Sequence, residues 1–170
     1  FFLIVRRPPG STRFPSPPLF RSVFIDTGST NIVLAGSLPR DTPLTVVTSS
    51  PAVAVALSDA DQIETIMIGG RLEGTTGGVT GSVAVQALQH YRFDLCSLGV
   101  WAISAEGPSV WDHEQPVFKR QVLSRRDSVA TMDAASTIGS GGRLAYAPLA
   151  TVTTLTATAV ASTHCLHTIT

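Results

Sequence analysis

The chain has 170 residues, of which 44% are hydrophobic and 14% charged, and its 12 basic residues balance its 12 acidic residues. This composition is too apolar for a disordered protein, and the length suits one domain with a sizeable core. The balanced charge predicts no nucleic-acid surface, and no apolar run approaches the ~18–20 residues that cross a bilayer, so no membrane contact is expected.

Residues 1–20 precede the first segment with a regular hydrophobic period. Five prolines fall between residues 6 and 20, which predicts a linker or the remnant of a tag. Residues 1–5 are apolar, but Arg6 and Arg7 follow them, which is the reverse of the order in a secretory signal. The predicted domain therefore covers residues 21–170.

Strand-like and helix-like segments alternate from residue 21 onward. Strands are predicted at residues 23–26, 44–48, 63–68, 93–100 and 128–133, with weaker candidates at 152–156 and 165–169. Helices are predicted at residues 29–38, 51–58, 83–91 and 114–126. A glycine-rich loop covers residues 69–81 and an irregular segment covers 102–113. The pattern predicts an α/β fold with an open, mostly parallel sheet of about six to seven strands and helices on both faces.

The turn between the first predicted strand and helix has the sequence Asp26-Thr27-Gly28-Ser29-Thr30. A helix N-terminus has unpaired N–H groups and the positive end of the helix dipole, and Gly28 lets an anion approach the backbone closely. Ser29 and Thr30 add hydroxyl donors, which favours a phosphate site. The alternative is a tight turn in which Ser or Thr serves only as an N-cap.

Polar residues and glycines also follow the other predicted strands, and the carboxyl ends of parallel strands share one edge of a sheet. The candidate residues at this edge, besides residues 26–30, are Thr48, Ser49, Gly69, Gly70, Arg71, Gly81, Gly99, Val100 and Asp133. Hydroxyls, backbone N–H groups and a few charges suit a phosphorylated sugar or polyol. The phosphate is expected on residues 28–30 and Thr48, with Asp26 or Asp133 accepting hydrogen bonds from sugar hydroxyls.

The cysteines and histidines predict no metal site and no cofactor. Cys96 and Cys165 lie far apart and give neither a disulfide framework nor a zinc spacing. The run His164-Cys165-Leu166-His167 is more typical of a half-exposed strand than of a metal site.

Several ordered motifs carry a resemblance to a known family. They are Val-Phe-Ile-Asp-Thr-Gly-Ser-Thr at 23–30, Leu-Thr-Val-Val-Thr-Ser at 44–49, Ile-Gly-Gly-Arg at 68–71, Phe93-Asp94 through Leu98-Gly99, Glu114, Lys119-Arg120 and residues 129–133. Over about residues 21–156 this order resembles the C-terminal effector-sensing domain of DeoR-family bacterial transcription repressors.

That resemblance implies a fold like those of ribose-5-phosphate isomerase and CoA transferases, and a phosphorylated sugar as effector. It implies a cytoplasmic homo-oligomer, a dimer or tetramer, whose separate N-terminal winged helix-turn-helix, absent from this chain, binds operator DNA. Residues 26–30 and 48–49 become the phosphate cradle by this analogy, and Glu114 and Lys119 become further effector-binding candidates. The chain departs from the family at Ser49, where Asn is usual, at Thr137, where Lys is usual, and at Ala157, where Asp is usual.

A sensor must bind its ligand differently in two states. We expect the phosphate to draw in the loop at residues 69–81 and Lys119 or Arg120, which would alter the dimer geometry. The alternative for Lys119 and Arg120 is that they are surface charges on a helix. Trp101 and Trp111 are candidates for the pocket wall, for core packing or for a subunit contact.

The resemblance also supplies an enzyme as the alternative function. Ribose-5-phosphate isomerases carry Asp-Gly-Ala-Asp-Glu where residues 98–102 of this chain read Leu-Gly-Val-Trp-Ala. Proton transfer requires a positioned carboxylate base, and that acidic cluster is missing. Glu106 and Glu114 are more typical of solvated or ion-paired residues, so no catalytic residue is predicted and the chain is interpreted as a sensor.

Overall fold

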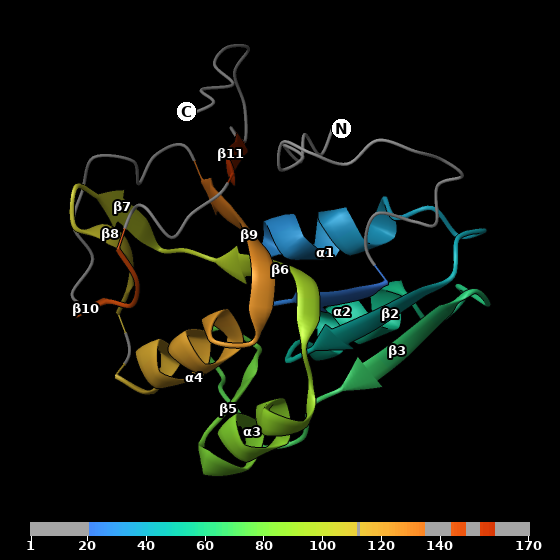
Figure 1. Cartoon of the computed structure of the whole chain (residues 1–170), viewed down its shortest axis with the longest axis horizontal. Helices are drawn as coiled ribbons and strands as arrows, with labels where there is room; N and C mark the ends of the chain where they lie inside the picture. The colour runs from blue at the N-terminus through green and yellow to red at the C-terminus, as the bar shows by residue number, and fades with distance from the viewer. Residues whose placement is uncertain (1–20, 112, 135–143, 149–153, 159–170) are drawn as a thin grey trace.

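The computed structural model describes residues 21–111, 113–134, 144–148 and 154–158, with the backbone alone for 128–134 and 154–158. Six of its strands form one parallel sheet in the order β11-β9-β6-β1-β2-β3 (Figure 1). These strands are β1 (Ser22–Ile25), β2 (Leu44–Thr48), β3 (Ile63–Met67), β6 (Phe93–Gly99), β9 (Arg126–Ala134) and β11 (Thr154–Thr158). The predicted α/β fold with a parallel sheet is confirmed.

Helices cover both faces of this sheet. They are α1 (Ser29–Gly36), α2 (Pro51–Ala56), α3 (Ser82–Ala87), which continues into the 3-10 helix η1 (Leu88–His90), and α4 (Glu114–Leu123). Successive residues of β1 point to opposite faces, so Ile25 packs in one hydrophobic cluster with Ala35 of α1, and Phe24 packs in the other with Phe118 of α4. The two clusters explain why the strands read as continuous apolar runs. Among the described residues, no helix is long and apolar enough to cross a membrane.

Local sequence signals set where several elements begin and end. The Ser50 side chain accepts a hydrogen bond from the Val53 N–H, and Pro51 occupies the first turn, so α2 begins where the sequence predicts. The third helix ends as an α-helix four residues earlier than predicted and finishes as η1, and α4 ends at Leu123 rather than at residue 126. The strand predicted at 152–156 is found as β11, and the one predicted at 165–169 lies outside the described residues.

Two segments predicted to lack regular structure contain short antiparallel strands. In the segment at 102–113, β7 (Ala102–Ser104) pairs with β8 (Gly107–Val110), and β8 pairs with β10 (Leu144–Ala145). In the glycine-rich loop, β4 (Arg71–Leu72) pairs with β5 (Val79–Thr80). Strands of two to four residues are too short to show an alternating pattern, and β10 supplies its pairing from a distant part of the chain. The prediction of irregular structure was therefore wrong at these strands.

The order of the sheet creates a crevice between β1 and β6. From β1 the chain proceeds outward through β2 and β3, then returns to place β6 on the other side of β1. The connection after β1 leads into α1, whereas the connection after β6 leads through β7 and β8 to α4 on the opposite face. Such a topological switch point is where open parallel sheets bind ligands.

We expect the Cys96 thiol to resist alkylation in the folded protein. Cys96 is fully buried in β6, and burial, with a smaller contribution from Asp26, raises the pKa of its thiol above the usual range. The reactive thiolate is therefore scarce at neutral and mildly alkaline pH. A Cys165→Ser variant has Cys96 as its sole cysteine, so a thiol titration should detect no reactive group until denaturant is added. Rapid labelling without denaturant would contradict this packing.

Candidate functional site

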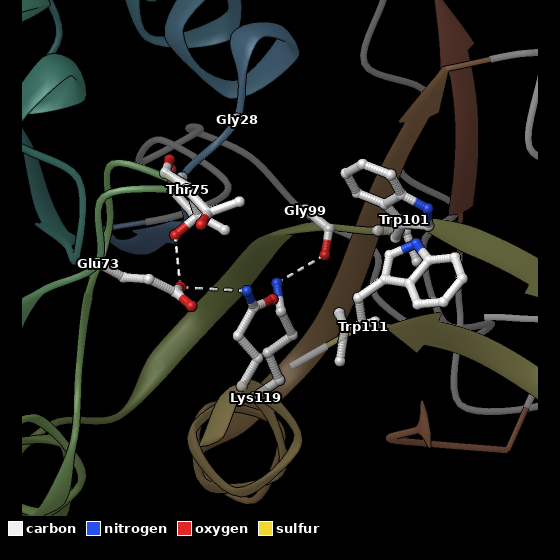
Figure 2. Close-up of a pocket in the computed structure, with 12 residues that line it drawn as sticks. Gly28, Glu73, Thr75, Gly99, Trp101, Trp111 and Lys119 are labelled. Carbon is white, nitrogen blue, oxygen red and sulfur yellow. Dashed lines mark hydrogen bonds between the residues drawn. The ribbon is translucent and has the colours of Figure 1, made fainter. Parts of the chain in front are cut away.

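A cavity of about 600 Å³ opens at the switch point between β1 and β6. This volume falls within the range of about 300–1,000 Å³ that is common for small-molecule sites. Its lining comes from the turn after β1, the β4–β5 loop, the segment after β6, the end of β8, and α4 (Figure 2). The lining residues are Thr27, Gly28, Glu73, Thr75, Thr76, Gly99, Val100, Trp101, Val110, Trp111, Gln115 and Lys119.

The N-terminus of α1 lies at this cavity through Gly28. Gly28 is the N-cap residue with φ of 124°, no side chain caps the helix, and a Cβ atom on Gly28 would have nothing within 4 Å. The first helical hydrogen bond runs from the Ile32 N–H to the Gly28 carbonyl at 3.0 Å. The N–H groups of the first turn consequently lack intrahelical acceptors. Ser29 and Thr30 are the first two helical residues and not the N-cap, so the capping alternative was wrong.

A buried ion pair lies beneath the cavity. Asp26 directly follows β1 and pairs with Lys119 of α4, and their side chains are 3% and 4% exposed. The Asp26 carboxylate also accepts hydrogen bonds from the Ser49 hydroxyl and the Gly99 N–H, each at 3.1 Å. Lys119 donates to the Gly99 carbonyl at 2.6 Å and lies 5.7 Å from the centre of the Tyr146 ring. The network joins the ends of β1, β2 and β6 to α4.

This network corrects two expectations for charged residues. Lys119 is not a surface charge, because it occupies the buried face of α4 beside Phe118 and Val122. Asp26 accepts its hydrogen bonds from protein groups, so a sugar hydroxyl has no direct approach to it here. The sequence did hold a signal for Lys119, since it falls at the helical spacing of the apolar residues around it.

The loop between β4 and β5 forms one wall and is attached to three neighbouring elements. The Thr27 hydroxyl donates to the Thr76 carbonyl at 2.6 Å, and the Val79 N–H donates to the Ser49 carbonyl at 2.8 Å. The Glu73 carboxylate accepts hydrogen bonds from the Thr76 hydroxyl at 2.7 Å and the Gln115 amide at 3.3 Å. Figure 2 shows Glu73 and Thr75 facing Lys119 across the cavity.

The structure brings only part of the predicted site to this cavity. Among the effector-binding residues predicted from the sequence, those in the lining are Thr27, Gly28, Gly99, Val100 and Lys119. Asp26 and Ser49 line a smaller pocket that shares Thr27 and Lys119 with the cavity. Ser29 and Thr30 adjoin the cavity as the first turn of α1.

The remaining predicted residues lie elsewhere. Thr48 is fully buried, and its hydroxyl donates to the Ile25 carbonyl at 2.6 Å and accepts from the Ser50 N–H at 3.0 Å. This corrects the expected phosphate contact of Thr48, because the hydroxyl is used within the fold. The residues around the β4–β5 hairpin and the starts of α3 and α4 are outside the lining: Gly69, Gly70, Arg71, Gly81 and Glu114. Arg71 pairs with Glu114 at the surface, and Asp133 lies in β9 with its backbone alone described.

Sequence reasoning missed several lining residues. Glu73, Thr75 and Thr76 were not singled out, because the centre of the loop was interpreted as a glycine-rich turn, and Gln115 was missed on α4. The run Glu-Gly-Thr-Thr at 73–76 was the available signal, since it concentrates polar side chains at the centre of a long loop. Trp101 and Trp111 do line the cavity, which was one of the three roles considered for them.

Close packing at Gly99 gives a testable consequence. A Cβ atom there would lie 2.7 Å from the Thr27 carbonyl oxygen, so Gly99→Ala forces the turn after β1 away from β6. We expect a loss of about 1–2 kcal/mol in the free energy of unfolding, measured in urea. Gly36→Ala is the control, because a Cβ at this last residue of α1 meets nothing within 4 Å. Equal stability of the two variants would contradict the contact.

No group of three or more His, Cys, Asp or Glu side chains able to hold a metal ion occurs in the described part of the chain. The predicted run at residues 164–167 lies outside that part.

Fold and site together define an α/β domain with a ligand-sized cavity at the switch point of its sheet. Residues 20–158 match the model of the DeoR C terminal sensor domain, and the chain belongs to this family. The family predicted from the sequence is thereby confirmed.

Known relatives of the chain are transcriptional regulators. It is 34% identical over 59% of its length to a putative aga operon transcriptional repressor of Escherichia coli O157:H7. It is 32% identical over 62% to the HTH-type transcriptional repressor GlcR of Bacillus subtilis, and 31% identical over 66% to the glycerol-3-phosphate regulon repressor of Haemophilus influenzae. The matched regions span 38%, 41% and 44% of those three proteins.

A search of solved structures finds a likeness to ribose 5-phosphate isomerase A from Methanocaldococcus jannaschii. The TM-score is 0.46 at 10% identity, over 69% of this chain and 46% of that one.

Proposed function

We propose that this chain is the effector-sensing part of a transcriptional repressor and that its effector is a phosphorylated sugar or polyol. The observation that carries the proposal is the uncapped N-terminus of α1, which opens at Gly28 onto a cavity of about 600 Å³. The family model and the regulators among the relatives support the regulatory role. The name of one relative, a glycerol-3-phosphate regulon repressor, supports a phosphorylated ligand.

The phosphate is placed on the first-turn N–H groups of α1. Lys119 is the cation of the described lining, and Asp26 and the Gly99 carbonyl already hold it, so the backbone donors supply most of the attraction. Each hydrogen bond to a charged group contributes about 1.5–3 kcal/mol, and a few of them support micromolar binding after the cost of association. Glu73 repels a phosphate and suits sugar hydroxyls instead.

The response to the ligand is assigned to the walls of the cavity. The β4–β5 loop and α4 both line it, so a ligand that binds one arrangement of them more tightly shifts their equilibrium. We propose that a homo-oligomer transmits this shift to a winged helix-turn-helix elsewhere in the whole protein. The chain spans about two fifths of the curated relatives it matches, which leaves room for that domain.

We propose that the domain does not catalyse isomerisation of its ligand. Glu73 is the carboxylate among the described lining residues, and Thr76 and Gln115 hold it by hydrogen bonds. Isomerisation of a sugar phosphate needs a positioned base with a partner acid. An assay with ribose 5-phosphate should show no conversion above background, and turnover at an ordinary enzymatic rate would contradict this assignment.

Calorimetry against paired ligands tests the proposed effector class. The panel contains glycerol 3-phosphate, hexose 6-phosphates and ketohexose 1-phosphates, each beside its dephosphorylated form. We expect at least one phosphorylated member to bind in the micromolar range, and its dephosphorylated partner to bind about 100-fold more weakly, because the charged hydrogen bonds are lost. Equal binding of both forms, or binding of no phosphorylated member, would overturn the proposal.

A further inference from the structure

Two tryptophans form one side of the cavity. Trp101 follows β6 and Trp111 follows β8, and the two segments are joined by a hydrogen bond from the Trp101 N–H to the Ser109 carbonyl at 3.1 Å. The indole rings meet edge to face, with centroids 6.2 Å apart and planes at 81°. Their residues are 55% and 49% exposed, which is unusual for side chains of this size.

The opposite side of the cavity is polar. Figure 2 shows Glu73 and Thr75 across from the indoles, with Lys119 and Gly99 between the two sides. The cavity therefore has an anion-binding corner at Gly28, a hydrogen-bonding side at Glu73 and an aromatic side at Trp101 and Trp111. A ligand that fills it must offer a phosphate, hydroxyl groups and an apolar face.

A sugar phosphate in its closed-ring form has that combination of surfaces. Its hydroxyl groups point largely outward around the ring, and one ring face exposes polarised C–H bonds that suit the negative face of an indole. An open-chain polyol phosphate presents no fixed face and loses more conformational freedom when it is ordered. The aromatic side thus discriminates between ring and open-chain forms.

We propose that Trp101 and Trp111 form a sugar-ring subsite and that the effector is a sugar phosphate bound in its cyclic form. This inference rests on the proposed function, because the phosphate at α1 fixes which end of the ligand faces the indoles. Trp101 and Trp111 act as specificity-determining residues. They contact the ring, while the first turn of α1 holds the phosphate.

Chemical reduction supplies a matched pair of ligands for the test. Borohydride converts an aldohexose 6-phosphate into the open-chain hexitol 6-phosphate, which keeps the phosphate and the carbon chain and cannot close a ring. We expect the cyclic form of the best-bound hexose 6-phosphate to bind about tenfold more tightly than its hexitol in calorimetry. The two tryptophans are the chain's only ones, so binding should also change its intrinsic tryptophan fluorescence.

Alanine variants test whether the indoles cause the preference for the ring form over the hexitol. Trp101→Ala and Trp111→Ala should each bring the affinities for ring and hexitol within about threefold of one another, chiefly by weakening the ring form. Val55→Ala, an exposed position on α2, is the control and should keep the full preference. The ratio of the two affinities is the readout, because a general loss of folding lowers both affinities together.

The outcomes separate this inference from the proposed function. If phosphorylated forms bind and ring and hexitol bind equally, the subsite is wrong and the sensor assignment stands. If the tryptophan variants keep the preference for the ring form, or bind both forms more weakly by the same factor, the indoles do not recognise the ring. Their exposure then serves a subunit contact or packing. If phosphate makes no difference to binding, the proposed function and this inference both fail.

Discussion

Replacing Lys119 with methionine is expected to lower the free energy of unfolding by about 3–5 kcal/mol. The substitution leaves the Asp26 carboxylate buried without its cation, and the Ser49 hydroxyl and Gly99 N–H remain its only compensation among the described residues. Methionine retains most of the length of the lysine stem, so the charge and not the packing is what changes. Urea unfolding followed by circular dichroism measures the loss.

A double-mutant cycle and an exposed ion pair control this result. Asp26→Asn in the Lys119→Met background should recover part of the stability, because an amide costs less to bury than an unpaired carboxylate. Arg40→Met breaks the exposed pair of Arg40 with Asp59, which should cost less than about 1 kcal/mol. A Lys119→Met variant that loses no more stability than Arg40→Met would show that the buried pair is not formed as described.

Replacing Ser29 with proline is expected to weaken binding of a phosphorylated ligand by about 1.5–3 kcal/mol, or roughly 10- to 150-fold. Proline removes the first backbone N–H of α1 and is favoured at the first helical position. The preceding Gly28 has ψ of 149°, which is the extended value that a following proline requires. The helix should therefore form unchanged while the anion site loses one donor.

Ser29→Ala is the matched variant for this comparison. It removes the Ser29 hydroxyl and keeps the Ser29 N–H. Comparing the two variants therefore shows which of these two donors contacts the phosphate. We expect Ser29→Ala to bind the best phosphorylated ligand of the panel within a few-fold of the parent chain, measured by calorimetry. If Ser29→Pro bound that ligand as well as Ser29→Ala does, the phosphate would not contact this N–H group.

The fold could be predicted from the sequence because the main strands are long enough to show a continuous run of apolar residues. β1, β2 and β6 each carry apolar residues on both faces, and Ser50 with Pro51 marks the start of α2. The strands β7 and β8 were missed because they are too short to show an alternating pattern, and β10 was missed because it pairs with β8 across many residues of chain.

The part of the site next to the strand ends was the easiest to predict. Gly28 and Gly99 were singled out because they follow parallel strands at the sheet's carboxyl edge, and both line the cavity. Thr48 follows a strand in the same way, but its hydroxyl turns inward to the Ile25 carbonyl. Whether a polar side chain at a strand end faces the cavity or the interior depends on the neighbouring loops, which the sequence alone does not place.

The most direct measurement of ligand position is an amide chemical-shift titration of the isotopically labelled chain with a hexose 6-phosphate and with the free hexose. We predict that the phosphorylated sugar shifts the amides of residues 28–30 and 99–101 most strongly, with little change in α2. The free hexose should leave residues 28–30 nearly unshifted at the same concentration. Shifts confined to other parts of the chain, or the same shifts at residues 28–30 with both sugars, would contradict a phosphate site at the N-terminus of α1.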